Sequence, residues 1–147
     1  MFVVFDVETT GLFASQHHRV IELAAVRIDD NGEIVDEFVS LFNPGRDIGP
    51  TSIHGLVSAD ILDAPQFHEL AGHIAEFFDG AIAYAGHNVW FDFDFLRSEF
   101  NRCDVSLPEL PLACTMRLAG GCDRTSESSS CQLVCRVAEF LEVFPKI

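Results

Sequence analysis

The chain has 147 residues, of which 48% are hydrophobic and 14 are phenylalanine, and its formal net charge is −14. This length and apolar content favour one compact domain over residues 1–147 and exclude a disordered chain. No apolar run approaches the ~20 residues of a membrane span, and no charged leader with a cleavage site opens the sequence, so we expect a cytoplasmic protein without membrane contact.

Apolar and alternating patterns predict strands in the first third of the sequence. Strands are expected over residues 2–7 and 20–28, and the Asn31-Gly32 turn leads into a third strand over 34–42. Turns this short join antiparallel neighbours. Residues 44–50, with two prolines and two glycines, are expected to form a loop.

Helix and strand patterns alternate in the rest of the chain. Apolar residues recur at i, i+3, i+4, i+7, i+8 and i+11 over residues 67–78, which predicts an amphipathic helix that ends at Gly80. A strand over 82–85, a helix over 91–102 and a short strand over 112–115 should follow. The expected fold is therefore α/β, with a mixed five-stranded sheet flanked by helices.

Two carboxylates lie near the end of the first predicted strand. Asp6 and Glu8 are spaced i, i+2, so their side chains point to the same face of a strand. Neighbouring like charges on a half-buried strand repel, and a divalent cation between them would remove that cost. Hard oxygen ligands suit Mg²⁺ or Mn²⁺. The alternative, from these residues alone, is a strand with two solvated acids before a turn.

A third carboxylate, Asp92, follows an apolar stretch over residues 81–85 and the polar pair His87-Asn88. It would lie in the first turn of the predicted helix, where the helix dipole favours negative charge. A carboxylate in that position can face the carboxyl end of a neighbouring strand. We therefore expect Asp92 to complete a three-carboxylate metal site with Asp6 and Glu8.

Three segments in this order resemble the motifs of the DnaQ-like 3′–5′ exonucleases of the DEDD group, which include proofreading subunits of replicative DNA polymerases. Phe5-Asp6-Val7-Glu8-Thr9-Thr10-Gly11-Leu12 is close to the first motif, and His87-Asn88-Val89-Trp90-Phe91-Asp92 matches the second. Ile53-His54-Gly55-Leu56, followed by Ala64-Pro65-Gln66-Phe67, resembles a connecting signature of the family. The resemblance covers about residues 2–140.

The resemblance implies a ribonuclease-H-like fold and a metal-dependent 3′–5′ exonuclease that hydrolyses phosphodiester bonds at single-stranded 3′ ends of DNA or RNA. It implies two Mg²⁺ or Mn²⁺ ions held by the catalytic acids Asp6, Glu8 and Asp92. Leu12 would press on the base of the terminal nucleotide as an apolar wedge. The residues implied to bind substrate are Thr9, Thr10, Gly11, Leu12, His54, Asn88 and Phe91.

The family's third motif, a fourth acid preceded by a histidine or tyrosine, has no counterpart in this sequence. No histidine follows His87, the only tyrosine is Tyr84, and the last aspartate, Asp123, falls in the Gly/Ser-rich stretch 120–130, a predicted flexible loop. We expect the third motif to lie beyond Ile147. Because a positioned general base contributes ~10²–10⁴-fold to rate, the chain as given should be weak or inactive.

Net charge bears on how the chain could bind nucleic acid, and cysteine usage bears on a zinc site or disulfides. A net charge of −14 is unusual for a nucleic-acid binder, since phosphate contacts usually come from basic surfaces. One interpretation is that a partner such as a DNA polymerase presents the substrate. Because the third motif is missing, the alternative function is a non-catalytic module of the same fold that binds nucleic-acid ends or docks a polymerase. The five cysteines lack a C-x-x-C pair, which argues against a zinc site or a disulfide framework.

Overall fold

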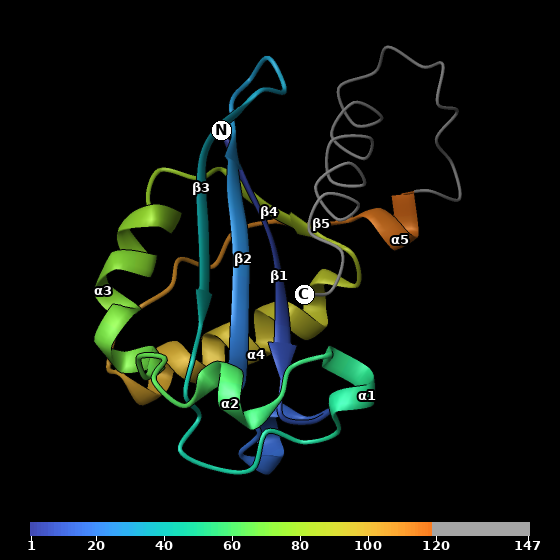
Figure 1. Cartoon of the computed structure of the whole chain (residues 1–147). Helices are drawn as coiled ribbons and strands as arrows, with labels where there is room; N and C mark the ends of the chain where they lie inside the picture. Colours follow the sequence, from blue (N-terminus) through green and yellow to red (C-terminus); the bar gives the residue numbers. More distant parts are fainter. Residues whose placement is uncertain (119–147) are drawn as a thin grey trace.

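A five-stranded sheet of order β3-β2-β1-β4-β5 organises residues 1–118, the part of the chain that this computed structural model describes (Figure 1). The strands are β1 (Phe2–Thr9), β2 (Val20–Ile28), β3 (Ile34–Leu41), β4 (Ala83–Gly86) and β5 (Leu112–Cys114). The helices are η1 (Ala14–Gln16), α1 (Thr51–His54), α2 (Ser58–Ile61), α3 (Phe67–Phe78), α4 (Val89–Arg102) and α5 (Thr115–Leu118).

The sheet is mixed, as predicted. β2 pairs antiparallel with both β1 and β3, whereas β1–β4 and β4–β5 are parallel. The β2–β3 turn is stabilised by Asp29, whose Oδ1 accepts hydrogen bonds from the N–H groups of Asn31 and Glu33, both at 2.9 Å. Gly32 adopts a φ of 84°, a left-handed conformation that glycine enters without strain. The predicted turn therefore forms by local chemistry.

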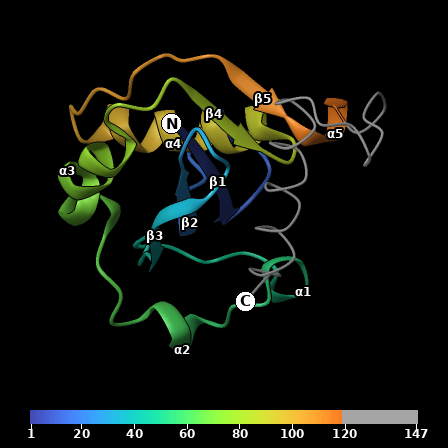
Figure 2. The same cartoon turned by 90° about the horizontal axis from the view of Figure 1, so that it is seen from above.

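Helices α3 and α4 pack on one face of the sheet. Their buried side chains form the main core with Val3, Phe5 and Val7 of β1, and Figure 2 shows both helices beside the strands from a second direction. The predicted stripe of α3 is the face that it buries, since Phe67, Ala71, Ile74 and Phe78 all belong to this core. The opposite face carries a smaller apolar cluster, formed by Val4, Val26, Ile28 and Ala85.

The element boundaries differ from the prediction at a few points. α4 begins at Val89, two residues early, because Asn88 enters the left-handed region at φ 58° and starts the helix there. β5 ends at Cys114, and Thr115 opens α5. The short helices η1, α1 and α2 were not predicted, since three or four residues are too few to show a helical period. The predicted loop over 120–130 lies outside the described residues.

The longest helix of residues 1–118 is α4, with 14 residues. No helix in that part of the chain has the length and apolar character needed to cross a membrane.

Candidate active site

The two acids of β1 lie near the end of the strand, before the loop that leads into β2. Asp6 and Glu8 alternate with core residues and share the face of β1 that carries Val4. Both are partly exposed. Because β1 and β4 run parallel, their carboxyl ends meet at one edge of the sheet, and the chain that leaves β4 enters α4 there. The structure thus places both acids where the sequence predicted them.

Asp92 comes to this edge from the first turn of α4. It is 3% exposed, and its Oδ1 accepts a hydrogen bond from the N–H of Val7, with an N···O distance of 3.4 Å. Its other oxygen, Oδ2, is buried and has no hydrogen-bond partner among residues 1–118. A buried carboxylate oxygen without a donor is costly, and a bound cation is one group that would relieve the cost.

The acids of β1 and α4 interact electrostatically. The pKa of Asp92 is raised to about 8, first by burial, then by the charge of Asp6 and to a smaller extent by that of Glu8. Within residues 1–118, no three His, Cys, Asp or Glu side chains are already arranged to hold a metal ion. The donor set, three carboxylates with one orphaned buried oxygen, fits Mg²⁺ or Mn²⁺ in its chemistry.

β2 adds a fourth acid that the sequence analysis missed. Glu22 lies directly opposite Glu8 in the antiparallel register and therefore on the same face of the sheet. It is 6% exposed, and its pKa is raised by burial first and by the charge of Asp6 second. In the sequence, the only indication of this fourth acid is that a glutamate interrupts the apolar run over residues 20–28. Its partner depends on the register, which shifts between Glu8 and Thr9 and is not visible in the sequence.

Side-chain bonds fix the predicted substrate-binding turn after β1. Thr10 is buried, and its Oγ1 lies 3.1 Å from Nδ1 of His18 and accepts the N–H of Arg19 at 3.0 Å. Thr9 Oγ1 donates to the carbonyl of Gly11 at 2.7 Å. A Cβ at Gly11 would collide with the His18 imidazole, so a larger residue at this position would force that ring to move. The two threonine hydroxyls are thus engaged in holding the shape of the turn.

A buried ion pair ties α4 to the end of the same loop. Glu99, 1% exposed, accepts two hydrogen bonds from Arg19, from Nε at 2.7 Å and from Nη2 at 2.8 Å. It also accepts the N–H of Val20 at 3.1 Å and Nη1 of Arg102 at 3.2 Å. The hydrogen bond to Glu99 raises the pKa of Arg19. The bidentate contact between Arg19 and Glu99 joins residues 80 positions apart and holds the end of the β1–β2 loop against α4.

His54 differs from the other predicted substrate-binding residues. It is 1% exposed, and both of its ring nitrogens contact the backbone. The N–H of Leu56 donates to Nδ1 at 3.2 Å, which leaves Nε2–H to donate to the carbonyl of Ile48 at 3.0 Å. Its imidazole therefore holds the segment around α1 and offers no free nitrogen to a substrate. A histidine in a motif-like segment looks the same in sequence whether it is buried or exposed.

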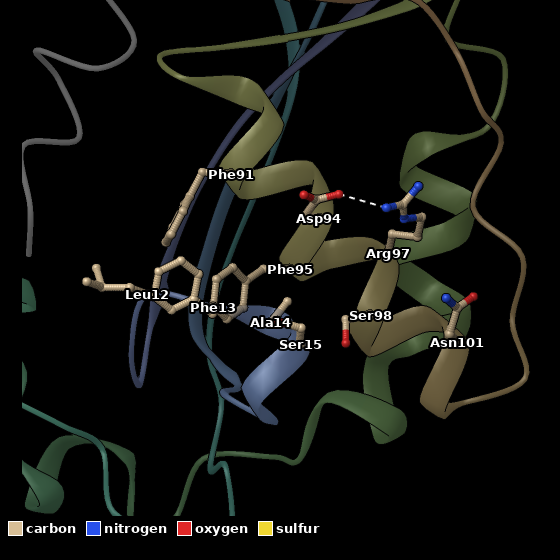
Figure 3. Close-up of a pocket in the computed structure, with 10 residues that line it drawn as sticks. All are labelled: Leu12, Phe13, Ala14, Ser15, Phe91, Asp94, Phe95, Arg97, Ser98 and Asn101. Atoms are coloured by element: carbon tan, nitrogen blue, oxygen red, sulfur yellow. Dashed lines mark hydrogen bonds and ion pairs between the residues drawn. The ribbon is translucent and has the colours of Figure 1, made fainter.

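Leu12, Asn88 and Phe91 are all accessible to solvent. Leu12 is 63% exposed, Asn88 is exposed at the start of α4, and Phe91 is half-buried one residue before Asp92. Leu12 and Phe91 line one pocket of about 360 Å³ (Figure 3). The structure thus brings these two predicted substrate-binding residues together in one pocket.

The sequence over residues 3–140 matches the RNase T family model, described as an exonuclease. The chain belongs to this exonuclease family. Exonucleases of the DEDD type generally use divalent metal ions.

Curated relatives of this exonuclease domain are much longer proteins. A DNA polymerase III subunit epsilon-like protein of Rhodobacter capsulatus is 42% identical over 99 residues, which make up 65% of this chain and 14% of that protein. A PolC-type DNA polymerase III of Oceanobacillus iheyensis is 41% identical over 120 residues, which make up 80% of this chain and 8% of that protein. The chain therefore spans less than a fifth of either relative.

Solved exonuclease structures share the fold. E. coli Exonuclease I, in complex with a dT13 oligonucleotide, superposes with a TM-score of 0.68 at 17% identity, covering 99% of this chain and 41% of that chain. The nuclease domain of 3′hExo, a DEDDh family member bound to rAMP, gives a TM-score of 0.63 at 14% identity and covers 99% and 92% of the two chains. The likeness confirms the predicted ribonuclease-H-like fold.

Proposed function

We propose that this chain is a metal-dependent 3′–5′ exonuclease domain acting on the 3′ ends of single-stranded nucleic acid. The observation that carries the proposal is the buried carboxyl of Asp92, in the first turn of α4, on which the charges of Asp6 and Glu8 of β1 act. Asp92 is buried with one oxygen unpaired, an arrangement that lowers stability and is typical of functional sites. Membership of the exonuclease family supports the same activity.

The three acids would hold two Mg²⁺ or Mn²⁺ ions. When bound, such a pair supplies an activated water and stabilises the leaving 3′ oxygen in phosphodiester hydrolysis. The residues of this chain hold the three carboxylates in position. Asp92 is held by the N–H of Val7, and Asp6 and Glu8 by the geometry of β1. Glu22, opposite Glu8 in the register, adds a fourth carboxyl to the same face of the sheet.

The loop after β1 would position the substrate. Its backbone at Thr9, Thr10 and Gly11 approaches the terminal nucleotide, and Leu12, which is 63% exposed, presses on the terminal base. Phe91 and Asn88 contact the same nucleotide from the start of α4. His54 supports the neighbouring segment from within and does not contact the substrate.

We assign no general base among residues 1–118. The sequence has no histidine after His87, and Tyr84, its only tyrosine, is buried in the core. Hydrolysis by this chain should therefore be slow, by up to the ~10²–10⁴-fold that a positioned base contributes. The same observation favours a second candidate function, in which the domain binds a 3′ end or docks a DNA polymerase without cleaving. The names of the two curated relatives support a polymerase as partner.

Degradation of 5′-labelled oligonucleotides in Mn²⁺ tests the proposal. Single-stranded DNA and RNA of the same sequence should be shortened stepwise from the 3′ end, and Asp6→Ala should abolish the shortening. Asp36→Ala, an exposed acid on β3, is the matched control and should cleave like the parent. A circular single strand should stay intact. No shortening by a chain that still binds Mn²⁺ would favour the non-catalytic candidate, and shortening that survives Asp6→Ala would contradict the assigned site.

A further inference from the structure

A tryptophan ring and an arginine lie together at the carboxyl edge of the sheet. Trp90 belongs to the first turn of α4, and the guanidinium carbon of Arg117 lies 4.2 Å from the centre of the Trp90 ring. Arg117 belongs to α5, which follows β5 directly (Figure 1). Because β1, β4 and β5 run parallel, the Trp90–Arg117 pair lies at the edge of the sheet that carries the acids.

The Trp90–Arg117 pair lies outside the acid site itself. Residues two positions apart in an α-helix point about 200° apart, so Trp90 and Asp92 leave α4 on nearly opposite sides. Trp90 is 37% exposed, whereas Asp92 is 3% exposed. A helix with its side chains is ~10–12 Å wide, so roughly this distance separates the pair from the carboxyl of Asp92. The pair is therefore a surface feature beside the proposed site, and neither side chain belongs to the predicted catalytic or substrate-binding residues.

Arg117 has no oxygen partner in the part of the chain that the structure describes. It is exposed, and its guanidinium makes no ion pair and no hydrogen bond within residues 1–118. The other arginines of residues 1–118 all contact a carboxylate or a backbone carbonyl: Arg19, Arg27, Arg46, Arg97 and Arg102. A guanidinium that stacks on a ring keeps the N–H groups along its edge free. Arg117 is thus a planar cation that can bind an anion at its edge.

This arrangement fits the backbone of a nucleic acid. A guanidinium donates two parallel hydrogen bonds to one phosphate, and proteins that bind single strands combine aromatic rings with cations. Because a formal net charge of −14 repels phosphate overall, an arginine without an acidic partner has a large effect on where a strand can lie. A carboxylate of a protein partner would suit the same cation. The position beside the acids favours the strand, because its 3′ end is proposed to lie there.

We propose that Arg117, held against Trp90, binds a backbone phosphate of the substrate strand roughly three nucleotides from the 3′ end. This spacing follows from the width of α4, ~10–12 Å, and from the ~3.4 Å that separates successive phosphates along a helical strand. The inference rests on the proposed function, because the 3′ end must lie at the acids. It narrows the substrate class, since strands of about four nucleotides or more reach Arg117 and bind more tightly than mono- and dinucleotides.

The fluorescence of Trp90 tests the proposal directly. Trp90 is the only tryptophan of the 147 residues, so a change in tryptophan emission reports on this pair. Titration in Ca²⁺ with a twelve-nucleotide oligothymidylate should change the emission, whereas thymidine monophosphate, which reaches only the acid site, should not. Anisotropy of a 5′-fluorescein-labelled copy of the strand gives the Kd independently. Saturation with the strand without a change in emission would overturn the proposal, and so would an equal change with the monophosphate.

The salt dependence of binding tests the charge of Arg117. For a single strand, each phosphate contact adds ~0.7 to the slope of log Kd against log salt. Arg117→Gln should lower that slope by about this amount, so that between 20 and 200 mM KCl its Kd rises roughly fivefold less than that of the parent. Arg117→Lys keeps the charge and should keep the slope.

Arg27→Gln is the matched control for Arg117→Gln. Arg27 also lies over an aromatic ring, that of Phe77, but it pairs with Val3 near the start of β1, at the opposite edge of the sheet. Its removal changes the net charge equally and should leave the slope as in the parent. An unchanged slope in Arg117→Gln, or an equal decrease in Arg27→Gln, would contradict the assignment. Thermal melts establish that each variant is folded.

An Asp6→Ala sample separates this inference from the proposed function. Binding of the strand that depends on Ca²⁺ and on Asp6, but not on Arg117, leaves the exonuclease site standing and refutes the phosphate contact. The same result is expected if the Trp90–Arg117 pair docks an acidic segment of a protein instead. A strand that does not bind the parent chain refutes both the contact and the proposed function.

Discussion

Removal of the buried charge of Asp92 should stabilise the metal-free domain by an amount that grows with pH. Asp92 is 3% exposed, and burial with the charges of Asp6 and Glu8 raises its pKa to about 8. In an unfolded chain, an aspartate titrates near pH ~3.9. Between about pH 4 and pH 8, the folded domain therefore holds a proton at Asp92 that the unfolded chain has released.

This difference in bound protons sets the sign and the size of the effect. Because the folded state holds the extra proton, the free energy of unfolding falls as pH rises, by ~1.4 kcal/mol per pH unit. The contribution is complete below about pH 4 and is lost as pH rises toward 8. From pH 5 to pH 7 the loss is ~3 kcal/mol. Asp92→Asn does not titrate, so its stability relative to the parent should improve by about this amount over the same interval.

Urea unfolding in EDTA at pH 5, 6 and 7 measures this change. A buried amide at position 92 changes stability by an amount that is the same at every pH. The result is therefore the change with pH of the difference in free energy of unfolding between Asp92→Asn and the parent, from which this constant amount cancels. Asp36→Asn, which removes an exposed carboxyl of β3, is the control for the chemistry of the substitution. A difference between Asp92→Asn and the parent that does not change from pH 5 to pH 7 would refute the claim that this carboxyl is buried among other acids. Added Mn²⁺ should stabilise the parent and not the variant.

Three other variants test the site and its support. Asp6→Ala should abolish Mn²⁺ binding measured by calorimetry, because Asp6 is one of the three carboxylates that would hold the ions; unchanged affinity would remove the metal assignment. Glu99→Ala should lower the free energy of unfolding by about 3–5 kcal/mol, since it leaves Arg19 without its bidentate partner, and a loss below ~1 kcal/mol would mean that the pair is effectively solvated. Tyr84→Phe should be neutral or stabilise by ~1 kcal/mol, because the buried Tyr84 hydroxyl has no hydrogen-bond partner within residues 1–118. A clear loss of stability in Tyr84→Phe, seen in thermal melts, would show that the hydroxyl is bonded in solution.

Short-range patterns were sufficient for much of the fold. The i, i+2 spacing of Asp6 and Glu8 determines that they share a face of β1, because side chains alternate in any strand. The apolar stripe over residues 67–78 determines which side of α3 is buried. Asp92 was expected in the first turn of a helix and lies there. These features depend on neighbours within a few positions along the chain, and sequence alone therefore determined them.

Only the tertiary structure decided which side chains meet. Glu22 joins the acids because the strand register places it opposite Glu8. His54 offers nothing to a substrate because it is buried and both ring nitrogens are bonded to the backbone of Ile48 and Leu56. Glu99 reaches Arg19 across 80 positions of the chain. The raised pKa of Asp92 likewise arises from burial and from charges on another element. Burial and electrostatic interaction depend on distance in space, and for residues far apart in the chain that distance is fixed only when sheet and helices pack together.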